Sequence, residues 1–549
     1  MRSFILRFCP AVFLGACLAT AQAHEGDREP GSQQAPATRV LGEISFPTTT
    51  HSTEAQAAFI QGMLLLHLFE YPFAADQFRH ARELDPGFAM AYWGEAMTHN
   101  HPLWDQQDLD QARSVLAALG PTPEARQSTT TSQKEKDFLA SLDILYGDGT
   151  KAQRDLAYMQ YLHGMAGRYP DDPEVRLFYA LALMGVSSGV RDVPRYMESA
   201  AISESVFCAH PRHPGAAHYL IHAVDDPVHA PLGLEAARAL AVMAPDAGHA
   251  QHMTSHIFNA LGMWDDVVKA NVAATRVANS MLAERDLPPR HWGHYNFWLL
   301  YGLLQQGEQA KARELLQAAY DETVPAGIVP QDPLALDPDN SQFGSVVQMW
   351  ARYMIETRGR DSTVAAWVFD AKDAWDPRLN LSYVRGMLGG WAGDAQSARQ
   401  HLAKFQELAA GLGKIVHAMD PPPATNLLYL DRLGVMDHEL QAVVALAEKH
   451  PDQAVTLARE ASRLEGAMPY SFGPPFVDWP SAELLGDVLA RLGRHDEAVE
   501  AYQVQLQRSR LKALPLVGLL ASETARGNQA GADYARQLLQ QVRPVKLAQ

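Results

Sequence analysis

Histidines concentrate in residues 213–256. Within this stretch His218 and His222 are four residues apart, and so are His252 and His256. The second pair follows the first after 34 residues, a period found in arrays of helical hairpins. Residues four apart lie on the same face of an α-helix, so each pair presents two imidazoles side by side. This spacing suits chelation of a metal ion by neutral imidazole nitrogens.

Further polar residues are predicted to face the same space. His249 precedes His252 by three residues and therefore lies on the same helical stripe. Asp225 is suited to accept a hydrogen bond from a ring N–H or to bind the metal itself. The additional candidates are His249, His294, Asp225, Asn259 and His67.

The predicted metal ligands are His218, His222, His252 and His256, which would surround one ion or hold a close pair. Neighbouring helices pack about 8–10 Å apart, a gap that imidazole side chains can span. An all-imidazole ligand set favours copper or zinc over iron or nickel. The alternative is that these histidines only form hydrogen bonds in the core, or bind an acidic peptide without a metal.

Several other kinds of chemistry are not indicated. The sequence contains no H-E-x-x-H zinc motif, no G-x-S-x-G nucleophile motif and no phosphate-binding P-loop. Beyond residue 23 the only cysteine is Cys208, which excludes iron–sulfur clusters and thiol redox pairs. The formal net charge is −17, whereas a general nucleic-acid binder needs a basic surface. Nucleic acid is therefore not an expected partner.

The first 23 residues have the pattern of a secretory signal peptide. Arg2 and Arg7 precede an apolar run, and Ala21-Gln22-Ala23 forms a cleavage site of the A-x-A type. The alternative is a lipoprotein anchored through Cys17. No later stretch has the roughly 18 apolar residues of a membrane span. The sequence predicts a periplasmic or secreted protein with no transmembrane span in the mature chain.

Helical hairpins account for most of the remaining sequence. Small and aromatic residues recur at fixed spacing near both ends of the chain, and no alternating strand pattern competes with them. At the C-terminal end Gly486 and Tyr502 recur as Gly518 and Tyr534 with the same spacing. The corresponding residues near the start are Gly62, Ala74, Phe78, Ala81 and Pro86. The predicted fold class is all-α, built of stacked hairpins.

Proline-rich and glycine-rich stretches set the expected boundaries. The predicted divisions are a signal peptide (1–23), an extended polar lead-in (24–53), an N-terminal and central array with the histidines (54–320), a connecting loop (321–344), further helical hairpins (345–465), a loop rich in Pro, Gly and aromatic residues (466–480) and C-terminal units (481–549). At least one of the two loops is expected to fold over the histidines.

The chain resembles the tetratricopeptide-repeat superfamily from about residue 54 to its end. Blocks such as LLLHLFEYPFAADQFRHARELDPGFAMAYWGEAMTHNHPLW, HPGAAHYLIHAVDD and GHAQHMTSHIFNALGMWDDVVKAN resemble a group of exported bacterial repeat proteins of uncertain activity. The resemblance implies a solenoid in which the first helix of each hairpin lines a concave groove through its second, fifth and ninth positions. Units starting at Pro214 and Gly248 would place the paired histidines at the fifth and ninth positions. The implied architecture is a solenoid with a His-lined concave groove.

Three functions are compatible with these features. The leading hypothesis is an exported repeat protein whose central groove holds a transition metal or a metal-dependent ligand through the paired histidines. The second is a metal-dependent enzyme, either hydrolytic or a copper or iron oxidative enzyme, that uses the same cluster. The third is a metal-free scaffold that docks a peptide, an envelope protein or a small ligand in its groove.

The signal-peptide hypothesis predicts the start of the mature chain. Cleavage after Ala23 would leave His24 as the first residue. Intact-mass measurement and N-terminal sequencing of the exported protein should find this terminus. A lipid-modified Cys17 would instead establish the lipoprotein alternative.

Overall fold

A computed structural model describes residues 39–187, 190–470 and 472–543. The predicted signal peptide, Cys17 and His24 lie outside these residues. Within them the chain forms 25 α-helices, three short 3-10 helices and one pair of two-residue strands. The prediction of an all-α protein is confirmed. None of the described helices is both long enough and apolar enough to cross a lipid bilayer.

The N-terminal part contains nine helices and the single strand pair. The strands are antiparallel, with Asn100 opposite Gln107. The elements are α1 (Thr53–His67), α2 (Tyr71–Leu84), α3 (Ala89–Met97), β1 (Asn100–His101), η1 (Pro102–Trp104), β2 (Gln106–Gln107), α4 (Leu109–Leu119), α5 (Pro123–Gln127), α6 (Gln133–Leu145), α7 (Lys151–Arg168), α8 (Pro173–Gly185) and α9 (Val193–Ala209).

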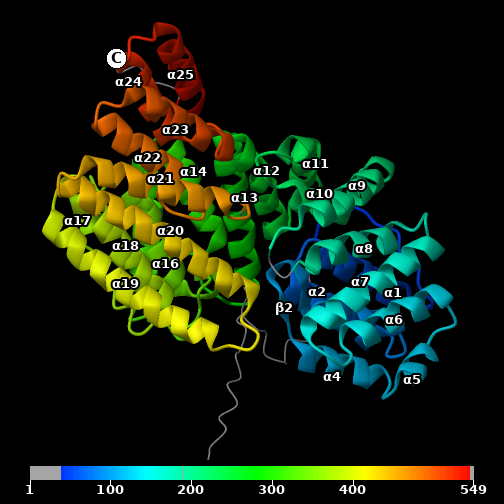
Figure 1. Cartoon of the computed structure of the whole chain (residues 1–549). Helices are drawn as coiled ribbons and strands as arrows, with labels where there is room; N and C mark the ends of the chain where they lie inside the picture. The colour runs from blue at the N-terminus through cyan, green and yellow to red at the C-terminus, as the bar shows by residue number, and fades with distance from the viewer. Residues whose placement is uncertain (1–38, 188–189, 471, 544–549) are drawn as a thin grey trace, which may run out of the picture.

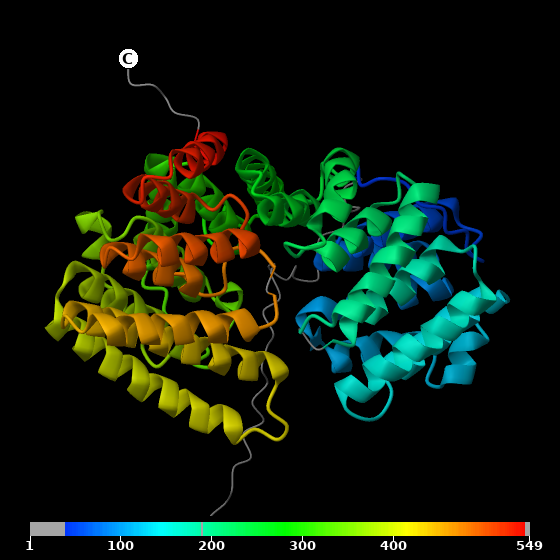
Figure 2. The same ribbon diagram turned by 45° about the horizontal axis from the view of Figure 1, so that its top comes forward.

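The central part contains the stretch in which histidines concentrate. Its elements are α10 (Pro214–Val224), η2 (Ala230–Gly233), α11 (Leu234–Met243), α12 (Gly248–Leu261), α13 (Trp264–Ala283), α14 (His294–Gln305) and α15 (Gln309–Thr323). In Figures 1 and 2, α10, α12 and α14 lie between the N-terminal helices and the helices that follow residue 340.

The C-terminal part begins after a non-helical connection. Its elements are η3 (Pro338–Asn340), α16 (Gln342–Glu356), α17 (Ser362–Ala365), α18 (Trp375–Ala392), α19 (Ala395–His417), α20 (Ala424–Ala447), α21 (Pro451–Ala467), α22 (Ser481–Arg491), α23 (His495–Arg508), α24 (Ala513–Ala525) and α25 (Gln529–Val542). Between α21 and α22 the described residues contain no helix, and Val477 and Trp479 there are buried.

Glycine and aromatic residues explain the close packing of successive hairpins. A Cβ added at Gly62 or Gly94 would lie 2.7 or 2.3 Å from the ring of Phe78. The same arrangement recurs at the C-terminal end, where Gly486 and Gly518 both contact the ring of Tyr502. Phe78 and Tyr502 each pack between two glycines where a larger residue would clash, whereas Tyr534, the next residue in the sequence recurrence, is 61% exposed.

The C-terminal hairpins pack back onto the central ones. The indole N–H of Trp264 donates to the carbonyl of Leu511 at 2.9 Å, and the Ala513 N–H donates to Gln305 Oε1 at 2.9 Å. A Cβ at Gly262 would lie 2.5 Å from the carbonyl oxygen of Arg510. The array therefore returns on itself, and residues about 250 apart in sequence are in contact.

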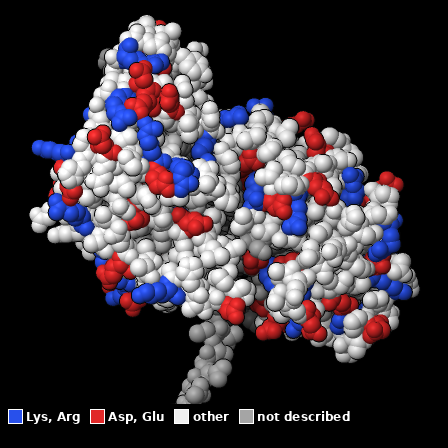
Figure 3. Space-filling view, viewed as in Figure 1, with Lys and Arg blue, Asp and Glu red and all other residues white. Residues whose placement is uncertain are grey.

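Residues 39–52 connect distant hairpins although they form no helix. Phe46 is buried against Phe59 and Phe138, with ring centroids 5.3 and 5.4 Å away. The Glu43 N–H donates to the Arg212 carbonyl at 2.9 Å. The expected polar lead-in thus contains apolar anchors. On the face shown in Figure 3, acidic and basic side chains are interspersed.

The glycine contacts predict a selective loss of stability. Gly486→Ala places a Cβ 2.5 Å from the ring of buried Tyr502, and overpacking of this kind costs about 1–3 kcal/mol. Gly434 lies within α20 with no atom within 4 Å of an added Cβ, so Gly434→Ala should be neutral or stabilising by up to about 1 kcal/mol. Chemical denaturation of both variants measures the difference. Equal effects would contradict this account of the packing.

Candidate metal centre

The paired histidines lie on two helices that begin where the repeat phasing places them. α10 starts at Pro214 and α12 starts at Gly248. The N–H of Ala216 donates to the His213 ring at the first turn of α10, and the N–H of His249 donates to Glu70 at the first turn of α12. These contacts fix both helix ends and hence the rotation of the two histidine faces.

Three histidines form a first triad. It consists of His218 and His222 from α10 and His249 from α12, and one ring nitrogen of each lies within 4.8 Å of the other two. The ring centroid of His218 lies 4.8 Å from that of His222 and 5.1 Å from that of His249. The geometry allows all three to bind one ion.

The Nε2 atoms of the first triad are buried and lack hydrogen-bond partners among the described residues. His218 shows the reason most clearly, because its Nδ1 lies 2.7 Å from the backbone carbonyl of His67. A carbonyl only accepts, so Nδ1 must bear the proton and Nε2 must have a free lone pair. Buried polar atoms without partners are rare in folded proteins. Here three such atoms belong to neighbouring rings, and each has a lone pair suited to binding a cation.

Burial keeps the rings of the first triad neutral. It lowers the pKa of His218 to about 3, and it lowers the pKa values of His222 and His249 well below the ordinary imidazole value. Repulsion among the neighbouring histidines lowers the last two further. Metal binding requires the neutral form of imidazole. The triad is therefore in its ligating form at pH 7.

A second triad lies beside the first. It consists of His252 and His256 from α12 and His294 at the start of α14, again with one ring nitrogen from each within 4.8 Å of the others. The ring centroids of His222 and His256, which belong to different triads, are 5.8 Å apart. The six imidazoles thus form one cluster made of two groups.

Each ring of the second triad is oriented by an acceptor on its outer side. His252 Nδ1 lies 2.7 Å from Asn271 Oδ1, whose amide nitrogen donates to a backbone carbonyl. His256 Nδ1 lies 2.9 Å from Asp225, and His294 Nδ1 lies 2.6 Å from Asp339. Carboxylate or carbonyl acceptors behind histidine are typical of metal sites, because they fix the tautomer and make the inner nitrogen more basic.

The inner nitrogens of His252 and His256 face each other. Their Nε2 atoms are 3.1 Å apart, while both Nδ1 atoms point toward acceptors. In the neutral state two lone pairs are therefore directed into the same space. Two imidazole nitrogens bound to one zinc ion at tetrahedral angles are roughly 3.3 Å apart. The observed separation is close to this value, and it also lies in the range of a hydrogen bond between the two rings.

A third group of metal-ligand residue types is satisfied by hydrogen bonds alone. His67 Nε2 and His213 Nε2 lie 2.7 and 3.1 Å from the two oxygens of Glu174. The other ring nitrogen of His67 lies 2.9 Å from the hydroxyl of Tyr219, and that of His213 accepts from a backbone N–H. Although burial opposes its charge, these histidines lower the pKa of Glu174 below its usual range. This group is a hydrogen-bonded core network.

The expectation of an open His-lined groove is not confirmed. His218, His252 and His256 are at most 2% exposed. Phe69 covers the first triad, with its ring centroid 4.5 Å from that of His218. Trp298 stacks on His256 at 4.5 Å. Aromatic residues after α1 and within α14 enclose the rings, because the hairpins that precede and follow α10 and α12 curve around them.

The sequence-predicted residues have different positions in this arrangement. His218 and His222 separate from His252 and His256 into two triads, so the four do not form one group. His249 joins the first triad and His294 the second, while Asp225 supports His256. Of the other two candidates, His67 belongs to the Glu174 network and Asn259 lines a neighbouring pocket.

Sequence reasoning missed Asn271 and Asp339. Asn271 follows His252 by 19 residues on the second helix of the same hairpin. Asp339 lies in η3, within the predicted connecting loop. Neither residue has a spacing that marks it, because its role depends on how separate elements meet.

Short loops join most consecutive helices into hairpins, and the hairpins stack in sequence order with glycine-to-aromatic contacts and a 34-residue step from α10 to α12. The fold is of the tetratricopeptide type.

No family model matches the sequence, and no curated protein matches it. Three similar solved structures are human IFIT1 with m7Gppp-AAAA (13% identity, 90% of this chain and 96% of that chain, TM-score 0.35), yeast Tom70 (13%, 87% and 96%, TM-score 0.34) and the Cut9–Hcn1 hetero-tetramer of the APC/C (12%, 90% and 74%, TM-score 0.33). These TM-scores are too low to support any inference about function.

The contrast between the first triad and the Glu174 network predicts opposite mutational effects in the presence of a chelator. His222→Leu removes a buried ring nitrogen that has no partner, so stability should stay the same or rise by about 1 kcal/mol or more. His67→Leu leaves Glu174 buried without one of its partners, which should cost about 3–5 kcal/mol. Melting temperatures of the metal-free variants test this. Similar losses in both would mean that the triad is ordinary core.

Proposed function

We propose that this chain binds two transition-metal ions, one in each histidine triad, and that zinc or copper is the metal. The observation that supports the proposal most strongly is the set of three buried Nε2 atoms without partners in the first triad. A bound cation would give all three lone pairs a partner at once.

The free energies involved favour a metal over an empty core site. Each buried polar atom without a partner costs about 1–3 kcal/mol. Structural zinc sites in small peptides return about 10–16 kcal/mol at pH 7. An apolar residue at any of the three positions would avoid the cost, as the adjacent Phe69 illustrates. The free-energy cost of burying imidazole at these positions is offset only if the nitrogens bind a partner such as a cation.

The two sites are expected to differ in affinity. Two carboxylates support the second triad: Asp225, which is also paired with Arg191, and Asp339. Contact with Asp339 raises the pKa of His294 although burial alone would lower it. In the first triad His218 has only a backbone carbonyl behind it. Negative charge behind the rings strengthens the attraction for a cation. The second site should therefore bind metal more tightly.

A metal-dependent enzyme is the second candidate. Each triad supplies three protein ligands, which leaves a position open for water or substrate in tetrahedral coordination. A metal with an open position can activate water or dioxygen, and the surrounding aromatic rings would keep bulk water out. Both the hydrolytic and the copper or iron oxidative versions remain compatible with this arrangement.

Export is part of the proposal. It depends on the N-terminal pattern of residues 1–23, and a periplasmic or secreted location would expose the chain to metals outside the cytoplasm. If the purified protein proves to be metal-free, the metal-free docking scaffold becomes the better explanation, with a peptide, an envelope protein or a small ligand as its partner.

Elemental analysis of the full-length exported protein tests the metal proposal. We expect two equivalents of zinc or copper per chain and a rise in melting temperature on metal addition, because the unfolded chain lacks the sites. His222→Ala and His252→Ala should each lose about one equivalent. His163→Ala, which removes an exposed histidine outside both triads, should keep both. Wild-type protein without metal, or full metal content in both triad variants, would refute the proposal.

A further inference from the structure

The two triads adjoin each other along α12, which supplies histidines to both. The ring centroids of His222 and His256, which belong to different triads, are 5.8 Å apart, and those of His249 and His252 are 6.2 Å apart. Some rings within one triad are no closer, since His222 and His249 are 6.2 Å apart and His256 and His294 are 6.5 Å apart. A ligating nitrogen lies about 2 Å from its metal. Ions held in the two triads would therefore be close neighbours.

The ligand sets of the two triads carry no negative charge. Both consist of histidines, and the ligating form of imidazole is neutral. The carboxylates of Asp225 and Asp339 lie behind the rings, where they accept from the Nδ1 atoms of His256 and His294. Asp225 is also paired with Arg191, which offsets its charge. Two metal cations in this space would repel each other unless a negative charge lay between them.

The strength of this repulsion depends on the charges of the ions. Two doubly charged ions repel each other about four times as strongly as two singly charged ions at the same distance, because the energy scales with the product of the charges. Burial strengthens the effect, since the effective dielectric constant inside a protein is low. An anion between the ions adds an attraction to each of them. For Zn²⁺ or Cu²⁺, occupancy of both triads therefore favours a bridging anion.

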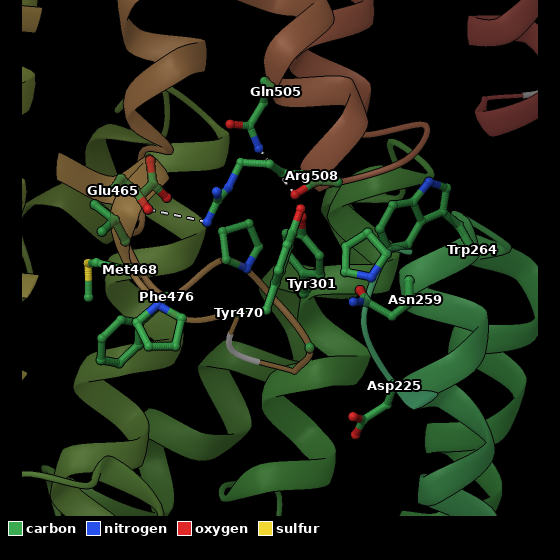
Figure 4. A pocket seen from close by; sticks show the side chains of 17 residues that line it. Asp225, Asn259, Trp264, Tyr301, Glu465, Met468, Tyr470, Phe476, Gln505 and Arg508 are labelled. Carbon is green, nitrogen blue, oxygen red and sulfur yellow. Dashed lines mark hydrogen bonds between the residues drawn. The ribbon is translucent and has the colours of Figure 1, made fainter. Parts of the chain in front are cut away.

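The surroundings of the cluster restrict such an anion to a few atoms. His222, the most exposed of the four paired histidines, is only 7% exposed. Phe69 and Trp298 pack on the first and second triads, each with its ring centroid 4.5 Å from that of a histidine. Asp225 also lines the adjoining pocket, whose volume of about 60 Å³ is enough for a few water molecules. In Figure 4, Asp225 lies at one end of this lining and Arg508 toward the other.

We propose that the two triads form one dinuclear centre in which a small anion, hydroxide in the resting protein, bridges the two metal ions. This inference rests on the proposed two-metal function and assigns a ligand to the same site. Two-metal sites hold their ions about 3.5–4 Å apart, a separation that one bridging oxygen spans. The open coordination position of each triad faces the other, and a shared water releases a proton to solvent because two cations stabilise the hydroxide that remains. Other small anions compete for this position.

Electron paramagnetic resonance of the full-length exported protein loaded with Cu²⁺ tests the bridge. Elemental analysis first establishes the copper content of each sample. A bridging anion couples the spins of the two ions, so the integrated signal should fall well below that of two isolated Cu²⁺ ions. His222→Ala and His252→Ala, which retain one copper ion, should give the full signal for their copper content. His163→Ala, an exposed histidine outside both triads, should behave like wild-type protein.

The outcomes separate this inference from the proposal on which it rests. Two equivalents of copper with the full signal of two uncoupled ions would overturn the bridge and leave the two-metal proposal intact. Fewer than two equivalents in the wild-type protein would refute the two-metal proposal, and the bridge with it. The wild-type measurement needs no substitution, so a variant that fails to fold does not affect it.

Titration with azide, followed by its absorption on binding copper, tests the class of ligand. The wild-type protein should bind one azide per two copper ions, because azide replaces the shared hydroxide. The single-copper variants should bind azide at least about tenfold more weakly, since they offer one contact instead of two. Circular dichroism confirms that each variant folds. Equal affinity in wild-type and single-copper protein, or one azide per copper ion in the wild type, would overturn the shared position.

Discussion

The burial of imidazole nitrogens that have no hydrogen-bond partner is the constraint on which the centre of this structure depends. In the adjoining core network, both ring nitrogens of His67 and of His213 have partners, and Glu174 accepts from each. The same fold therefore provides hydrogen-bond partners for buried histidines at another position. In the first triad it orients His218 through one nitrogen and leaves the other free. Such selective orientation is how proteins prepare ligands for a cation.

The repeat architecture makes this orientation possible. The 34-residue step places α10 and α12 side by side with their histidine faces in register, as stacked repeats relate their neighbours by a small and constant rotation. α14 follows with His294 at its first position. The proposed ligands thus come from three successive packed hairpins rather than from loops. The two carboxylate acceptors lie outside the α-helices, Asp225 just after α10 and Asp339 in η3.

The sequence predicts most of the fold and part of the site, for separable reasons. Helical periodicity and the glycine-to-aromatic contacts are local, so the hairpins and the starts at Pro214 and Gly248 could be predicted. The i,i+4 spacing likewise places His218 with His222. The division into two triads could not be predicted, because it depends on which ring of α12 turns toward α10 and which toward α14. Burial could not be predicted either, since Trp298 covers His256 from a separate hairpin.

The contact between the C-terminal and central hairpins changes how such an array should respond to stress. In an open solenoid each unit contacts only its neighbours, and the terminal units fray first. Here Trp264 donates a hydrogen bond to the carbonyl of Leu511, and the Ala513 N–H donates to Gln305. The last hairpins therefore contact those beside the histidines. Unfolding of the C-terminal hairpins would destabilise the central hairpins that carry the histidines. The chain should therefore unfold in one cooperative transition, whereas the repeats of an open solenoid can unfold one after another from the ends.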